Sequence, residues 1–258
     1  YPLVGVTRAD IVEEGIVEAN VPQLGAYSEP YYMPRPESLP LGNGAEYRNR
    51  PDYHQRYLGL EVQAIKRMSN RWMGRVGFST NTHKEYFDDP STAVQDPTPS
   101  TTWPNIAGGS YVTQTNGSGK SEIYLLLPRY QFTAGGAYQL PYRINIAGSI
   151  VAREGFGQPF FSTVESADPG LPEKRVLLVD PDDNRLPGVF THDLRAEKGF
   201  AFGGGSQLML TMDMFNVFNS STTLGRQYDV TATGSTGFYK TLEIMNPRLI
   251  RLGMRFQF

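Results

Sequence analysis

One glycine-rich segment of the sequence has the composition of a phosphate-binding loop. It reads Gly117-Ser118-Gly119-Lys120-Ser121. The P-loop pattern Gly-x-x-x-x-Gly-Lys-Ser requires a glycine five positions before Gly119, and Gln114 stands there instead. The segment also leads into an alternating, strand-like stretch, whereas a P-loop opens a helix. We therefore interpret it as a loop, and we do not predict nucleotide chemistry.

Two acidic segments could hold a cation. Asp180-Pro181-Asp182-Asp183-Asn184 has the opening spacing of a calcium loop, but that pattern then requires Gly at Arg185 and Glu at Thr191. The second segment combines Glu85 with three aspartates: Asp88, Asp89 and Asp96. Cation binding at either segment stays open as an alternative to a solvated loop, so we predict no metal site and no cofactor.

The histidines and the charge balance argue against catalysis and against nucleic acid. His54, His83 and His192 are too far apart in sequence to suggest a local metal site, and neighbouring strand residues such as His192 and Asp193 face opposite sides. Cysteine is absent, and the formal net charge of -2 offers no basic excess for nucleic acid. We therefore predict that the chain is not an enzyme.

The elements that must position these residues are strands. Apolar and polar residues alternate with period two in seven stretches, the pattern of a strand with one apolar face. The seven expected strands span residues 55–67, 72–80, 122–139, 143–155, 190–202, 207–219 and 246–258. In the fourth, Ile144, Ile146 and Ile150 oppose Asn145 and Ser149.

The connections between these strands alternate in length. Short turns are expected at 68–71, 140–142 and 203–206, and long loops at 81–121, 156–189 and 220–245. Outer-membrane β-barrels have short periplasmic turns and long extracellular loops, and their strands cross the bilayer with about 9–11 residues. The pattern favours an all-β, antiparallel transmembrane barrel over a soluble β-sandwich, which stays open as the alternative fold.

Strand parity predicts that part of the barrel is missing from this sequence. Single-chain bacterial barrels have an even number of strands, and seven are visible here. We expect residues 1–54 to be mostly extracellular loop, because 10–20 carry charge on both faces. Residues 55–258 would then be the C-terminal barrel strands, without the upstream strands.

The last fifty residues resemble the C-terminus of TonB-dependent receptors. Asp213-Met214-Phe215-Asn216-Val217-Phe218-Asn219 resembles the family's penultimate-strand signature. The segment from Asn246 to Phe258 resembles its closing strand, and its Phe256 and Phe258 resemble the signal read by the outer-membrane assembly machinery. Residues 49–57 and 66–72 resemble the corresponding sequences of the Oar-like subgroup of these receptors.

This resemblance implies a 22-stranded outer-membrane barrel around a plug domain. Such a Gram-negative receptor imports a scarce nutrient, a siderophore, glycan, peptide or similar ligand, with energy from the TonB complex. The plug and the TonB box that contact this complex are not in the sequence, so energy coupling is implied by the resemblance alone. The sequence does not specify the nutrient.

Aromatic residues in the predicted extracellular loops are the candidates for contacting a ligand. Aromatic side chains bring a large contact area with few rotatable bonds. The candidates are Tyr31, Tyr32, Trp103, Tyr111, Phe160, Phe161, Tyr228 and Phe238. The main alternative function is a structural or adhesion barrel without transport.

Overall fold

A computed structural model describes residues 7–21, 25–38, 53–87, 98, 110–111, 128–165, 173–180 and 183–258. The described residues form antiparallel β-sheets joined by loops and short 3-10 turns. The all-β, antiparallel fold class is therefore confirmed. No helix in these ranges is long and apolar enough to cross a membrane, a finding that concerns helices only.

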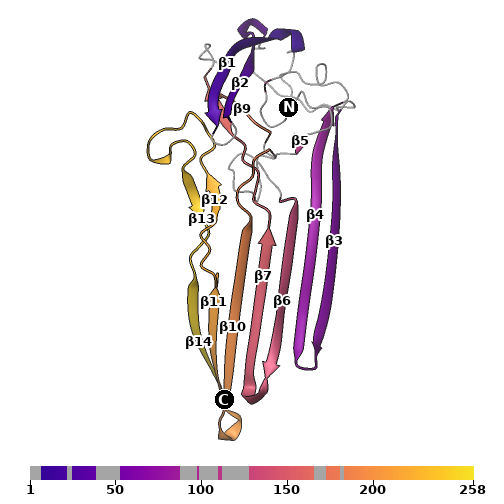
Figure 1. Ribbon diagram of the computed structural model, residues 1–258, viewed down its shortest axis with the longest axis vertical. Coiled ribbons are helices and arrows are strands. Elements are labelled where there is room, and N and C mark those ends of the chain that lie inside the picture. Colours follow the sequence, from indigo (N-terminus) through magenta and orange to yellow (C-terminus); the bar gives the residue numbers. More distant parts are fainter. Residues whose placement is uncertain are drawn as a thin grey trace.

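The main feature is a long sheet whose strands run along the longest axis of the molecule (Figure 1). Its order is β14-β11-β10-β7-β6-β4-β3, and a short strand, β5 (Ser110–Tyr111), also pairs with β4. The bounds are Tyr53–Ser69 for β3, Trp72–Phe87 for β4, Tyr130–Leu140 for β6, Ile144–Arg153 for β7, Val189–Ala201 for β10, Gln207–Phe215 for β11 and Leu249–Gln257 for β14. These are the seven strands expected from the alternation, with shifted ends.

Three tight turns join neighbouring strands at one end of this sheet, which we call the turn rim (Figure 1). Asn70 and Arg71 turn β3 into β4 with φ of 52° and 68°. The 3-10 turns η3 (Pro141–Arg143) and η4 (Gly203–Gly205) make the other two connections. Gly204 has a φ of 79°, a left-handed conformation that glycine adopts without the Cβ clash of other residues. The predicted turns are confirmed.

The sheet does not close on itself. Each inner strand has two antiparallel neighbours, whereas β3 and β14 each have only one long neighbour among the described residues. The described strands therefore form an open sheet and not the closed barrel that the sequence predicts.

Three hairpins lie outside the long sheet, toward the end opposite the turn rim, and we call them the cap (Figure 1). They pair β1 (Ile11–Val21) with β2 (Gly25–Pro34), β8 (Phe161–Val164) with β9 (Lys174–Leu177), and β12 (Thr223–Arg226) with β13 (Thr241–Ile244). Three further 3-10 turns lie at η1 (Arg8–Asp10), η2 (Pro36–Ser38) and η5 (Gly234–Thr236).

The first hairpin lies within residues 1–54, the segment expected to be mostly extracellular loop. A register shift between Glu13 and Gly15 interrupts strict alternation in β1, so no single apolar face is visible in the sequence. The structure nevertheless pairs this segment with β2, outside the long sheet. The prediction that residues 10–20 do not extend the long sheet agrees with this pairing, and the extracellular location of residues 1–54 stays a prediction.

Candidate functional site

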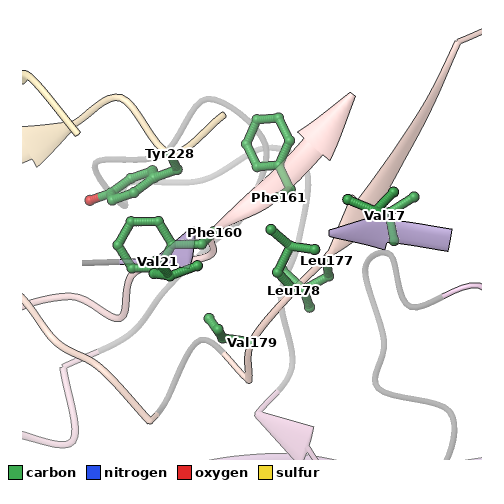
Figure 2. Close-up of a cluster of buried hydrophobic side chains, with 9 residues drawn as sticks. Val17, Val21, Phe160, Phe161, Leu177, Leu178, Val179 and Tyr228 are labelled. Carbon is green, nitrogen blue, oxygen red and sulfur yellow. The ribbon is translucent and has the colours of Figure 1, made fainter. Parts of the chain in front are cut away.

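The cap is held together by a hydrophobic cluster centred on Phe160, whose side chain has no exposed surface. Its ring makes edge contacts with the rings of Tyr228 and Phe238, at centroid distances of 5.7 and 6.0 Å. Val17 and Val21 of β1 also belong to the cluster, as Figure 2 shows with its main members. Residues from all parts of the cap therefore share one core.

Backbone hydrogen bonds tie the same segments together. The Phe161 N–H donates to the Tyr228 carbonyl at 3.1 Å, and the Val230 N–H donates to the Phe161 carbonyl at 2.8 Å. Burial raises the pKa of the Tyr228 hydroxyl to about 12, because the anion would lose its hydration. The cap is thus a folded unit and not a set of independent loops.

Four of the predicted ligand-contacting aromatics lie together, but as core residues. Phe160, Phe161 and Tyr228 are buried, and Phe238 is partly buried against them. In this arrangement the three buried side chains offer no surface to a ligand, so the structure does not support their predicted role. The apolar run from Val176 to Val179, also buried, was the sequence signal for a core within the loop expected at 156–189.

Of the remaining predicted aromatics, Tyr31 and Tyr32 lie in β2 of the cap. The Tyr31 ring lies over Gly15, where an added Cβ would approach its hydroxyl to 2.9 Å. The Tyr32 N–H donates to Thr98 Oγ1 at 2.8 Å, and its ring is half-buried. Tyr111 pairs with β4 through its backbone, but its side chain and the whole of Trp103 lie outside the described part of the chain.

The two predicted assembly-signal residues lie at the end of β14. Phe256 pairs with Leu208 on the apolar face, and its ring centroid is 6.1 Å from that of Phe258. Both side chains are largely exposed, and Phe258 is fully so. Their role in assembly stays a prediction.

A buried carboxylate at the end of β7 links the residues before β6 to the segment between β9 and β10. Glu154 follows β7 and accepts hydrogen bonds from Arg129 N at 2.8 Å and Arg129 Nη2 at 2.5 Å. Arg185 Nη1 lies 3.3 Å from Glu154 Oε2, the oxygen that also accepts from Arg129 N. Burial raises the pKa of Glu154, but the hydrogen bonds from Arg129 and the charge of Arg185 outweigh it and leave the pKa below its ordinary value.

The adjoining backbone leaves no room for a side chain. A Cβ added to Gly155 would lie 1.8 Å from the Leu186 carbonyl oxygen. The Arg185 guanidinium also donates to the Gly155 carbonyl at 3.1 Å. Sequence reasoning missed this junction because its members come from three separate segments.

One face of the long sheet carries a connected row of charged side chains. Asp213 of β11 accepts from Arg251 of β14 at 2.8 Å and lies 3.5 Å from Arg195 of β10. Arg195 also pairs with Glu197 at 2.8 Å. Two cations and two anions therefore balance across three neighbouring strands.

The resemblance motif around Asn216 has a structural role in this fold. Its buried side-chain amide donates to the carbonyls of Ser220 and Asn246, at 2.9 and 2.8 Å. Its backbone N–H donates to Asp193 Oδ1 at 2.9 Å. The motif thus fixes the end of β11 against β10 and the approach to β14.

The described residues contain no cluster of three or more metal-ligating side chains. Asp182, and with it the centre of the candidate calcium loop, lies outside them, as do Asp88, Asp89 and Asp96. His192 and Asp193 lie on opposite faces of β10, because they pair with Ile150 and Ser149, respectively. The site candidates are therefore surfaces of the sheet and the cap.

Comparisons with protein-family models, with curated proteins and with solved structures gave no match.

Proposed function

We propose that this chain forms wall strands of an outer-membrane β-barrel of the TonB-dependent receptor class, which imports a scarce nutrient. The observation that carries the proposal is the chemical difference between the two faces of the long sheet. One face bears apolar residues from all seven strands, and the other bears the paired charges around Asp213. The nutrient, the TonB complex and the assembly machinery are the partners this function requires.

The apolar face is exposed even on inner strands. Val76, Ile146 and Met212 have relative exposures of 46%, 43% and 42%, although each strand is flanked on both sides. Contiguous apolar patches on soluble monomers rarely exceed a few hundred Å². A lipid environment satisfies such a face, because the hydrocarbon chains take the place of a protein core.

The dimensions and polarity fit the same environment. The 10 residues of β7 match the roughly 9–11 that a tilted strand needs to cross a bilayer. Trp72 and Tyr138, which pair with each other, and Phe256 on β14 lie on the apolar face toward the turn rim, where barrels carry an aromatic girdle. We therefore assign the turn rim to the periplasm and the cap to the cell surface.

The resemblance around Asn216 and the closing strand supports the receptor class. The internal packing of the cap is also compatible with the alternative function, a structural or adhesion barrel without transport. Three of the expected ligand-contacting aromatics are core residues. A well-packed cap on a barrel would serve equally well in a structural or adhesion protein without transport. The proposal favours import because the charged face suits a water-filled lumen with a plug.

Two successive measurements test the proposal, first of membrane integration and then of transport. The intact protein should fractionate with the outer membrane and resist extraction by alkaline carbonate, as integral barrels do. After reconstitution with its energy-coupling partners, it should accumulate candidate nutrients in proteoliposomes. Release by carbonate would refute the barrel, whereas membrane integration without uptake of any ligand class would favour the structural or adhesion function.

A further inference from the structure

Three glycines lie side by side on the apolar face of the long sheet. Gly74 of β4 pairs with Gly136 of β6, which pairs in turn with Gly148 of β7. Gly74 and Gly148 have no positive φ, so their backbone suits any residue. At these two positions the distinctive property of glycine is the missing side chain. Gly136 also permits close packing, since a Cβ there would lie 2.9 Å from the Met73 carbonyl oxygen.

The missing side chains leave a shallow depression, which we call the glycine trough. It consists of two adjoining hollows of about 470 and 600 Å³ that share Trp72, Gly136 and Gly148. Tyr138 and Ile146 line one hollow, and Val76 and Ile150 line the other. The trough is thus a shallow, mostly apolar depression across three strands, which Lys66 and His192 also line, with aromatic side chains at its turn-rim end.

Lysine side chains on the same face extend toward the turn rim. Lys66 Nζ donates to the Ser69 carbonyl at 3.0 Å and to the Trp72 carbonyl at 3.1 Å. It also lies 4.0 Å from the centroid of the Trp72 ring. Lys198 Nζ donates to the Tyr142 carbonyl at 2.5 Å. These bonds to neutral carbonyls orient both ammonium groups without neutralising them.

The turn rim as a whole has an excess of positive charge. Its cations are Lys66, Arg67, Arg71, Arg143 and Lys198. None of the five forms an ion pair with a carboxylate of the described residues, and the nearby Glu197 is paired with Arg195. Lys66, which lines the trough, and Arg71 in the adjoining turn place cations beside an apolar surface. Such a surface complements a molecule with an anionic head and a hydrocarbon tail.

We propose that the glycine trough and the turn rim bind an anionic phospholipid from the leaflet that faces the turns. One acyl chain lies in the trough against Trp72 and Tyr138, and the phosphate lies beside the charged groups of Lys66 and Arg71. The proposal rests on the proposed membrane location. It goes beyond that location by assigning a lipid class and a site to one part of the apolar face.

The test uses the intact protein in a mild, uncharged detergent. Native mass spectrometry measures how much phosphatidylglycerol it retains, with phosphatidylcholine and inorganic phosphate as comparison ligands. Phosphatidylglycerol should bind in preference to both. The double substitution Lys66→Gln with Arg71→Gln should weaken its binding roughly 25-fold, because each interfacial cation contributes about a factor of five.

A second variant tests the trough itself. Gly148→Leu places a side chain in the glycine trough, and its Cβ would lie 3.2 Å from the Leu194 Cδ2 atom, which can move. Ala152→Leu is the matched control, because Ala152 lies on the same face of the same strand but does not line the trough. Gly148→Leu should lose the bound lipid, and Ala152→Leu should retain it.

The outcomes separate this inference from the proposed function. Equal retention of phosphatidylcholine and phosphatidylglycerol, or full competition by inorganic phosphate, would overturn the lipid site. Retention unchanged in both the charge variant and Gly148→Leu would overturn it as well. If the intact protein is absent from the outer membrane, the proposed function fails; if it is integrated there but binds no phosphatidylglycerol, only the lipid site fails.

Discussion

The assignment of the two sheet faces is tested most directly by placing the same charge on each. Met212 lies in the middle of β11 on the apolar face, in register with Ala196 and Leu252. Its neighbour Thr211 points to the charged face, in register with Glu197 and Gly253. Met212→Arg and Thr211→Arg therefore add one cation to adjacent backbone positions and opposite environments.

The expected difference follows from what surrounds each new guanidinium. Near the middle of the bilayer, an arginine on the lipid face costs about 2–4 kcal/mol, equivalent to roughly 30-fold to 700-fold in the folding equilibrium. At residue 211 the guanidinium would lie beside the Glu197 carboxylate in a polar setting. There we expect a change within about 0.5 kcal/mol, as for most exposed substitutions.

A third position separates lipid from a protein core. Leu208 lies on the apolar face of β11 near the turn rim, where the cost of arginine in a membrane falls to about 0–1 kcal/mol. If a second sheet covered this face, as in a β-sandwich, Leu208→Arg would cost as much as Met212→Arg. The gradient along one strand is therefore the informative quantity.

The measurement is denaturant-dependent folding of the intact protein into lipid vesicles, followed by its shifted mobility in unheated gels. Variants should rank with Met212→Arg least stable and the other two close to the unsubstituted protein. Similar stabilities for Met212→Arg and Thr211→Arg would refute the face assignment. Equal losses at residues 208 and 212 would refute the lipid environment.

Three further predictions concern topology and titration. In a chain without cysteine, Ser235→Cys should be labelled on intact cells and Ser69→Cys only after permeabilisation; the reverse pattern would invert the topology. Glu154 has a lowered pKa, so its contribution to stability should be present above about pH 4.5 and be lost as the pH falls through its folded-state pKa; denaturation curves of Glu154→Gln should lack this acid-dependent loss. Tyr228 has a raised pKa, so stability should decline as the pH rises from about 10 toward 12; unfolding curves of Tyr228→Phe should show a smaller decline over this range, and an equal decline in both proteins would refute the assignment.

The long strands were predictable because their physical signal is local. Alternation in 144–153 reflects one apolar and one polar face, whatever the distant parts of the chain do. The strand ends at the turn rim were also predictable, because Asn70 and Gly204 are residue types that adopt the left-handed conformations of tight turns readily. The end of β4 was predicted wrongly: the strand was expected to end at residue 80, where the apolar alternation weakens, but it extends to Phe87.

The cap could not be predicted in the same way, because its packing is nonlocal. Phe160 shares one core with Tyr228 and Val21, residues separated from it by long stretches of sequence. Its hairpins β8 and β9 have only four residues each, too few for periodicity to distinguish them from loops. An aromatic residue in such a segment has the same local signal whether it contacts a ligand or fills a core.

The strand directions in the long sheet constrain how a barrel could be completed. All six neighbouring pairs from β3 to β14 are antiparallel, so these two edge strands run in the same direction. Direct pairing between them would create a parallel seam. An antiparallel closure therefore needs an odd number of additional strands, contributed by the same polypeptide or by another. Such strands would also cover the unpaired backbone groups of β3 and β14, which otherwise invite association with other sheets.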